Sequence, residues 1–247
     1  MKIYILWLRQ LKRYMRSPSR IIGSLGQPIL FLLALGYGFG SVFSQAGQGN
    51  YLNFLAPGII GMSIIFTAIF SGIEIIWDRQ FGFLKEMMVA PMSRLSIMFG
   101  RTLGGATVAT IQGLIVLVLS LLFGFHPASV GMVLLSIPVM FLVALLFTGL
   151  GTMIASLLSD MQGFQLIMNF LVMPLFFLSG SLFPLDSAPG ALRTIAKADP
   201  LTYGIDAFRA LLINVHHFSL HVDLLVLSLF TIVFILLGGY FFNKIQI

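Results

Sequence analysis

Residues 102–159 read TLGGATVATIQGLIVLVLSLLFGFHPASVGMVLLSIPVMFLVALLFTGLGTMIASLLS and contain no Asp, Glu, Lys or Arg. A membrane-spanning helix needs about 20 apolar residues, so this run of 58 residues is long enough for two helices and a turn. Its segment 114–119, LIVLVL, is apolar on every face, whereas the strands of a membrane barrel alternate apolar and polar residues. The stretch therefore predicts helices that cross a membrane.

The composition of the whole chain agrees with this interpretation. Of its 247 residues 58% are hydrophobic and 9% are charged, and the mean hydropathy is +1.02. Soluble domains carry roughly 25% charged residues, so this chain has too few polar side chains to cover a globule in water. It has no cysteine, which excludes disulfides and thiolate chemistry.

Three further runs lack charged residues, namely 21–73, 161–185 and 224–243. A charge at the bilayer centre costs about 2.5–3.5 kcal/mol, so such runs mark spans. By length the first run holds two spans and the others hold one each, which makes six in all and predicts an all-α integral membrane protein. The predicted spans are Ile21–Phe43, Phe54–Ile76, Gly100–Phe123, Gly131–Leu157, Phe164–Phe183 and Leu224–Phe242.

The distribution of basic residues predicts the orientation. With both termini inside, the inner segments hold eleven of the 14 Lys and Arg residues and the outer segments hold three. Cytoplasmic loops carry this excess, so we expect a multi-pass protein of the plasma membrane with both termini in the cytoplasm. The net charge of +6 then reflects contact with anionic lipid and not with nucleic acid.

Residues 1–20 predict a basic amphipathic helix that lies on the membrane surface. At 100° per residue one face is apolar (Tyr4, Leu8, Leu11, Met15) and the other is basic (Arg9, Lys12, Arg13, Arg16, Arg20). The alternative is a set of basic residues that merely flanks the first span. Ser17-Pro18 should end the helix before that span.

The inner loop 77–99 mixes charges with apolar residues. Its segment 81–94 reads FGFLKEMMVAPMSR, in which Phe83, Met87 and Ala90 share one helical stripe and Pro91 stops the helix. A short cytoplasmic helix of this kind either contacts a partner or lies on the bilayer.

Residues 178–212 are too apolar for an exposed loop and too interrupted by Pro and Gly for a span. Two short amphipathic helices, about Pro189–Ala198 and Thr202–Ile213, would suit them, half-buried at the outer face. Irregular backbone at that depth must be covered by protein or face water, which suggests a re-entrant element.

Two motifs resemble a known family. The first is FGFLKEMMVAPMSR (81–94) followed by Gly100-Arg101, and the second is LSGSLFPL (178–185) closed by DPLTYGIDAFR (199–209). Together they resemble the ABC type-2 transporter permeases, in particular the drug and antibiotic exporters that include the daunorubicin-resistance and nodulation-factor permeases. The resemblance covers the chain as one transmembrane domain, 1–247, with a fold like that of type V ABC exporters. Its parts would be an interfacial helix (1–20), spans one and two (21–76), a coupling-helix loop (77–99), spans three to five (100–183), a re-entrant hairpin (184–213) and span six (224–243).

The resemblance implies an ATP-driven exporter of a drug, lipid, glycan or peptide. The inner helix would be the coupling helix, seated on a separate ATP-binding-cassette subunit present in two copies, and two permease copies would form a homodimer or a heteromeric pair. ATP and Mg would bind to the partner subunit, and no cofactor to this chain, whose sequence lacks the Gly-Lys dipeptide of a phosphate-binding loop. The implied coupling residues are Phe81, Gly82, Phe83, Leu84, Lys85, Glu86, Met87, Pro91 and Arg94. The implied hairpin residues are Gly180, Pro184, Pro200, Tyr203, Asp206 and Arg209.

Polar residues inside the spans are candidates for a substrate path, and they are Gln27, Thr67, Ser71, Glu74, Gln112, Gln165 and Asn169. Glu74 either faces water there or pairs with Arg79 at head-group depth. Pro28 and Pro174 should kink the first and fifth spans, which the family places at the dimer interface and the path.

Three histidines lie close together before the last span, at positions 216, 217 and 221. With Asp223 they either hold a metal or form an interfacial polar cluster.

The glycine pairs Gly36/Gly40 and Gly100/Gly104 have a spacing that allows close helix contact. A membrane-embedded enzyme or channel without an ATPase is the rival function, and the sequence does not identify the substrate.

Overall fold

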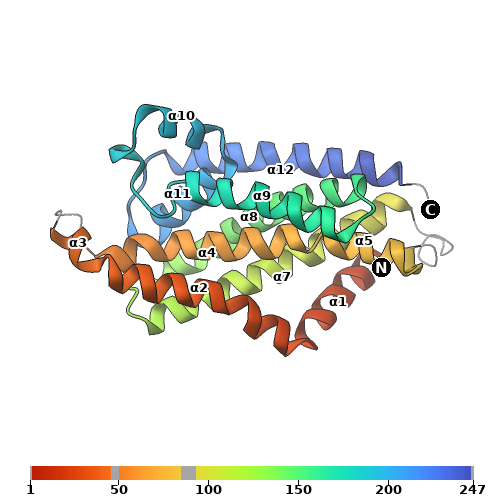
Figure 1. Ribbon diagram of the computed structural model, residues 1–247, viewed down its shortest axis with the longest axis horizontal. Coiled ribbons are helices and arrows are strands. Elements are labelled where there is room, and N and C mark those ends of the chain that lie inside the picture. The colour runs from red at the N-terminus through yellow and green to blue at the C-terminus, as the bar shows by residue number, and fades with distance from the viewer. Residues whose placement is uncertain (1, 46–49, 85–92, 246–247) are drawn as a thin grey trace.

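The computed structural model describes residues 2–45, 50–84 and 93–245, which form helices and no strand (Figure 1). Six helices or helix pairs in these ranges are long and apolar enough to cross a membrane. They are α2 (Pro18–Gly38), α4 with α5 (Tyr51–Phe70 and Ile73–Gln80), α7 (Arg94–Leu122), α8 (Val130–Leu157), α9 (Met161–Leu178) and α12 (Leu220–Asn243). The prediction of an all-α protein with six spans is confirmed.

The helix ends differ from the predicted spans for local reasons. α7 begins six residues before the predicted Gly100, because the hydroxyl of Ser93 accepts a hydrogen bond from the Ser96 amide and caps the helix. α9 ends five residues before the predicted Phe183, because Gly180 adopts a left-handed φ of 75° that closes the helix. Charge-free runs mark hydrocarbon depth, whereas caps and glycines end the helices.

Shorter helices join the spans. They are α1 (Lys2–Met15), α3 (Gly40–Gln45), the 3-10 turn η1 (Leu185–Ser187), α10 (Gly190–Ala198) and α11 (Pro200–Ile213). α1 ends before Ser17, and Pro18 is the first residue of α2, as predicted. The beginning of α1 and the end of α12 lie at one end of the bundle, whereas α3, α10 and α11 lie at the other (Figure 1).

The core is formed by α4, α7, α8 and α11. In the apolar window of α4–α5, 72% of residues are buried, compared with 17% in α2 and 22% in α9. The side chains that α2 and α9 leave exposed are mostly apolar, such as Leu30, Tyr37, Leu166 and Phe170. These two helices therefore present apolar faces to lipid or to another subunit.

The helix α1 packs along α7. A Cβ atom on Gly100 would lie 2.8 Å from the Cβ of Leu6, and one on Gly104 would lie 2.6 Å from the Cγ of Gln10. The spacing of this glycine pair thus serves a close helix contact, whereas Gly40 of the other pair has open space around it. The predicted apolar face of α1 is not the one that packs on the protein, since Tyr4 and Met15 are exposed and Leu6 and Tyr14 are buried.

Candidate functional site

Helix α5 carries two buried acids at the end of the bundle where α1 begins. Glu74 and Asp78 are each 4% exposed and lie one turn apart, so they share one face of the helix. A buried carboxylate is costly unless it is paired and hydrogen-bonded. Both acids must therefore find basic partners.

Four arginines supply these partners. Glu74 pairs with Arg20 at 3.1 Å and with Arg13 at 3.6 Å. Asp78 pairs with Arg9 at 3.6 Å and with the buried Arg101. We call these six residues, Arg9, Arg13, Arg20, Glu74, Asp78 and Arg101, the arginine cluster. It joins α1, α2, α5 and α7, and four guanidinium groups against two carboxylates leave it with a net positive charge.

The expected pair of Glu74 with Arg79 is wrong. Arg79 lies five positions after Glu74, about 140° around the helix at 100° per residue, so the two side chains leave different faces. Sequence reasoning also missed Asp78. The signal was present, because the acids at 74 and 78 have the same four-residue spacing as the arginines at 9 and 13.

The predicted coupling segment begins directly after α5. Phe81 and Phe83 are 71% and 49% exposed, Gly82 has a left-handed φ of 80°, and Leu84 is buried. The residues Lys85, Glu86, Met87 and Pro91, and most of the predicted helix 83–90, lie outside the described residues.

Arg94 stands where α7 starts. Its guanidinium donates to the backbone oxygens of Asn243, at 2.6 Å, and Ile245, at 3.1 Å. This arginine therefore joins the segment after the predicted coupling helix to the end of α12.

The candidate path residues do not form one site. Gln27 and Thr67 line a common cavity between α2 and α4. Ser71 instead faces α7, where a Cβ on Gly105 would lie 2.5 Å from its hydroxyl oxygen. On α9, Gln165 and Asn169 are exposed.

Gln112 is a packing residue. It is fully buried in α7 and accepts a hydrogen bond from the hydroxyl of Tyr14 in α1. Burial raises the pKa of Tyr14, against the lowering effect of Arg20, so this phenol stays neutral and remains a donor.

At the opposite end Arg209 of α11 anchors the second motif. Its guanidinium is buried and donates to the backbone oxygens of Gly180, at 2.9 Å, and Ser181, at 3.0 Å. The same group lies 3.7 Å from the centre of the Phe54 ring in α4. One side chain therefore joins α11 to α4 and to the turn after α9.

Other residues of this motif hold the neighbouring backbone. The carboxylate of Asp206 accepts hydrogen bonds from the amides of His217, at 2.8 Å, and Phe218, at 2.7 Å. The hydroxyl of Tyr203 donates to the Lys197 oxygen at 2.8 Å. Pro184 precedes η1, and Pro200 is the first residue of α11.

The start of α11 carries one unusual acid. The carboxylate of Asp199 caps the helix by accepting from the Leu201 amide at 2.8 Å. Burial raises the pKa of Asp199 to about 7, against the lowering effect of that hydrogen bond.

The two predicted amphipathic helices are present as α10 and α11, but they are not equally exposed. α10 has one buried residue, Ala196, whereas α11 is buried along almost its whole length. The expectation of two half-buried helices is therefore wrong for α11. Its anchors to α4 and α9 draw it into the core.

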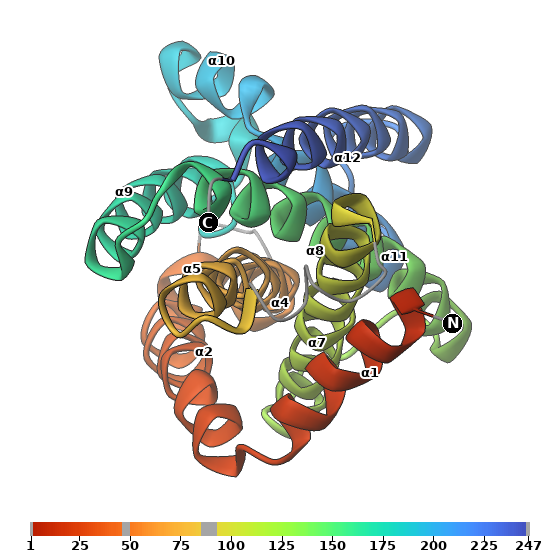
Figure 2. The same cartoon turned by 90° about the vertical axis from the view of Figure 1, so that its right-hand side faces the viewer.

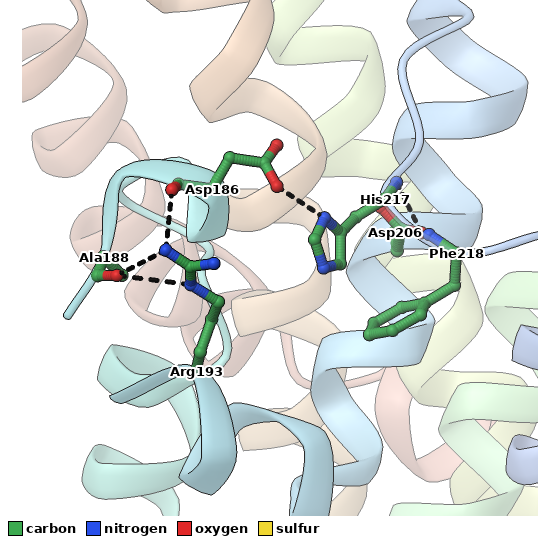
Figure 3. Close-up of polar contacts among 6 residues, drawn as sticks. All are labelled: Asp186, Ala188, Arg193, Asp206, His217 and Phe218. Carbon is green, nitrogen blue, oxygen red and sulfur yellow. Dashed lines mark hydrogen bonds and ion pairs between the residues drawn. The ribbon is translucent and has the colours of Figure 1, made fainter. Parts of the chain in front are cut away.

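His216 and His217 precede α12, and His221 lies in its first turn. His217 pairs with Asp186 at 2.8 Å, and Arg193 donates to the Asp186 and Ala188 backbone oxygens (Figure 3). His216 and His221 are exposed. Within the described part of the chain no group of three or more His, Asp or Glu residues is placed to hold a metal.

Comparison with known proteins identifies the family. The sequence matches the ABC-2 type transporter family over residues 1–213, up to the last residue of α11. The chain belongs to this family. A member of the ABC-2 type transporter family with six apolar helices is a multi-pass transport permease, and such permeases generally work with an ATP-binding subunit.

Individual relatives agree with this assignment. The putative transport permease ycf38 of Cyanophora paradoxa is 29% identical over 99% of this chain and 88% of its own length. Nodulation protein J of Rhizobium leguminosarum bv. viciae is 28% identical over 84% of this chain and 81% of its own length. The putative transport permease ycf38 of Pyropia yezoensis is 31% identical over 81% of this chain and 70% of its own length.

Proposed function

We propose that this ABC-2 permease is the membrane subunit of an ATP-driven exporter that carries an amphipathic or hydrophobic substrate out of the cytoplasm. Two copies of the chain would form a homodimer with two ATPase subunits, in the plasma membrane and with cytoplasmic termini. The basic residues gathered on α1 and at the start of α2 support that orientation.

The observation that carries the proposal is the arginine cluster at the base of the predicted coupling loop. Glu74 and Asp78 stand on α5, nine and five residues before Phe83, and their partners stand on α1, α2 and α7. A displacement of the loop by the ATPase would be passed through the ion pairs of these two buried acids to the first and third spans. The exposed rings of Phe81 and Phe83 would provide apolar contact with the partner.

The outer helices support a re-entrant hairpin like that of type V ABC exporters. α11 has 14 residues, about 21 Å at 1.5 Å per residue, which is too short to cross about 30 Å of hydrocarbon. The segment enters after α9 and returns to α12 at the same end of the bundle (Figure 1). Its buried anchor Arg209 would hold it at membrane depth.

The exposed apolar faces of α2 and α9 support the homodimer. Phe31 of α2 packs edge-on against Phe176 of α9, with ring centres 6.1 Å apart, so these two helices adjoin. Their outward faces would meet the second copy and flank a central path.

Copurification tests this function. The permease is expressed with an ATP-binding-cassette subunit, which we expect to be encoded by a neighbouring gene, and the complex is reconstituted for ATPase and transport assays against a panel of amphipathic compounds. We expect Glu86→Lys and Phe83→Ala to abolish substrate-dependent transport and to weaken retention of the ATPase, while expression stays normal.

The control is Phe39→Ala, which removes a similarly exposed ring, 53% exposed, at the opposite end of the bundle. It should leave the ATPase bound. Wild-type transport by both loop variants, with the ATPase retained, would show that the segment does not couple the two subunits.

A further inference from the structure

A cavity of about 240 Å³ lies between the first half of α2 and the second half of α4, with Tyr14 of α1 at its edge. Figure 2 looks along the bundle and shows α1 and α2 meeting in a V beside α4. With cytoplasmic termini, this cavity lies at the depth of the inner leaflet.

The lining has two kinds of surface. Arg20 stands in the first turn of α2, and Gln27 stands two turns further, about 10 Å along the helix. On α4, the rings of Phe66 and Phe70 are stacked with centres 6.2 Å apart and form an apolar wall. A cation and polar side chains therefore face an aromatic surface, which is the chemistry that receives an amphiphile.

One buried group in the lining has no partner. Ser63 is 4% exposed, and its hydroxyl makes no hydrogen bond in the structure. Because a buried hydroxyl without a hydrogen bond is unfavourable, a ligand or water that supplies the bond is favoured there. The cavity thus contains an unsatisfied polar site of its own.

The charge at the cavity mouth selects the sign of the ligand. Arg20 shares the single carboxylate of Glu74 with Arg13, and the side chain of Arg20 is 40% exposed. Two guanidinium groups on one carboxylate leave a positive charge that repels cations and that a phosphate or carboxylate would balance.

We propose that this cavity binds an anionic amphiphile, with its phosphate or carboxylate head group at Arg20, its polar part near Ser63 and its apolar chain along Phe66 and Phe70. The inference rests on the proposed export function, for which it names the substrate class.

Binding to the purified permease tests the head group. The probe is an acyl-labelled lysophosphatidic acid, and a labelled monoacylglycerol with the same chain is its neutral counterpart. We expect the anionic probe to bind at least tenfold more tightly, and Arg20→Gln to reduce its affinity about tenfold. Arg16→Gln removes the same charge from an exposed residue outside this cavity and should have no effect.

Competition with inorganic phosphate distinguishes an amphiphile with an anionic head group from a free phosphate ion as the ligand. Displacement of the probe only by amphiphiles supports a lipid-like ligand. Displacement of the probe by inorganic phosphate at equal concentration would overturn the proposal, because the acyl chain of the ligand would then contribute nothing to binding.

A second pair of variants tests the cavity without touching a charge. A Cβ added to Gly23 or to Gly26 would meet no atom within 4 Å, but only Gly23 lines the cavity. Gly23→Leu should therefore fold normally and weaken probe binding at least tenfold, whereas Gly26→Leu should bind like wild type. Equal binding by both variants, or equal binding of the anionic and neutral probes, would overturn the proposal.

The two proposals fail separately. Charge-selective binding without ATPase copurification would refute the exporter complex and leave the anion site standing. If the ATPase copurifies and the complex transports substrate, but the anionic and neutral probes bind equally well, only the anion site is refuted.

Discussion

Replacement of Arg101 by Gln should lower the free energy of unfolding by about 3 kcal/mol. Arg101 and Asp78 are each about 5% exposed and pair directly, so the variant leaves a buried carboxylate with one partner fewer. Breaking a buried ion pair costs about 3–5 kcal/mol. We expect the lower end, because Arg9 remains 3.6 Å from Asp78 and compensates part of its charge.

A double-mutant cycle isolates the pair. Asp78→Asn alone should also destabilise, since Arg101 then stays buried without its closest anion. The combination of Asp78→Asn with Arg101→Gln should lie within about 1 kcal/mol of wild type, because a neutral pair of similar volume needs no charge compensation. The two single costs then exceed the cost of the double variant by more than about 2 kcal/mol, which is the expected coupling energy.

Tryptophan fluorescence during SDS titration in mixed micelles provides the measurement. The chain has two tryptophans, and both lie at this end: Trp7 donates to Thr107 at 2.9 Å, and Trp77 lies beneath the guanidinium of Arg13. Arg16→Gln, which changes an exposed arginine, should shift stability by less than about 0.5 kcal/mol. The reasoning is refuted if Arg101→Gln lowers the free energy of unfolding by less than about 1 kcal/mol, or if the effects of the two single substitutions simply add in the double variant.

Three other predictions concern topology, the Arg209 anchor and pH. Single cysteines at Gln48, His126 and Lys197, placed in a chain without native cysteine, should be labelled from outside the cell, and labelling of any of them only from the cytoplasm would overturn the orientation. Arg209→Lys should cost about 2 kcal/mol in the same unfolding assay, because a lysine cannot reach both backbone oxygens and stack on Phe54. Arg193→Lys, at an exposed position of α10, should cost under about 1 kcal/mol. The folded-state pKa of Asp199, about 7, lies above its ordinary value of 3.8, so its contribution to stability is present at low pH and is lost as the pH rises from 4 to 7. Asp199→Asn should keep the helix cap and flatten that slope, and an unchanged slope would show that another group titrates.

Much of the fold depends on residues that are close together in the sequence, and it can therefore be predicted from the sequence. The six spans follow from charge-free runs, because the energy of burying a charge in hydrocarbon depends on the residue itself. The break at Pro18 and the helices α10 and α11 follow from proline, glycine and helical periodicity. The prediction of the coupling helix rests on the same local pattern and stays a prediction, because residues 85–92 are outside the described structure.

The site could be predicted only in part. The sequence marked Glu74, Gln27 and Thr67 as polar residues in apolar surroundings, and the structure places Gln27 and Thr67 on one cavity. It did not indicate that Gln165 and Asn169 would lie exposed on α9, or that Ser71 and Gln112 would pack between helices. A polar residue in a span has the same hydropathy whichever neighbour it faces.

The sequence alone determined that this chain is a helical membrane protein with six spans and two family motifs, because hydropathy, periodicity and turn residues act over a few positions of the chain. Only the tertiary structure decided that α1 packs on α7, that Glu74 pairs with Arg13 and Arg20 instead of Arg79, and that Arg209 draws α11 into the core. These choices join residues tens to more than a hundred positions apart. Their energies depend on which helix faces come together in space, and that is a property of the packed bundle.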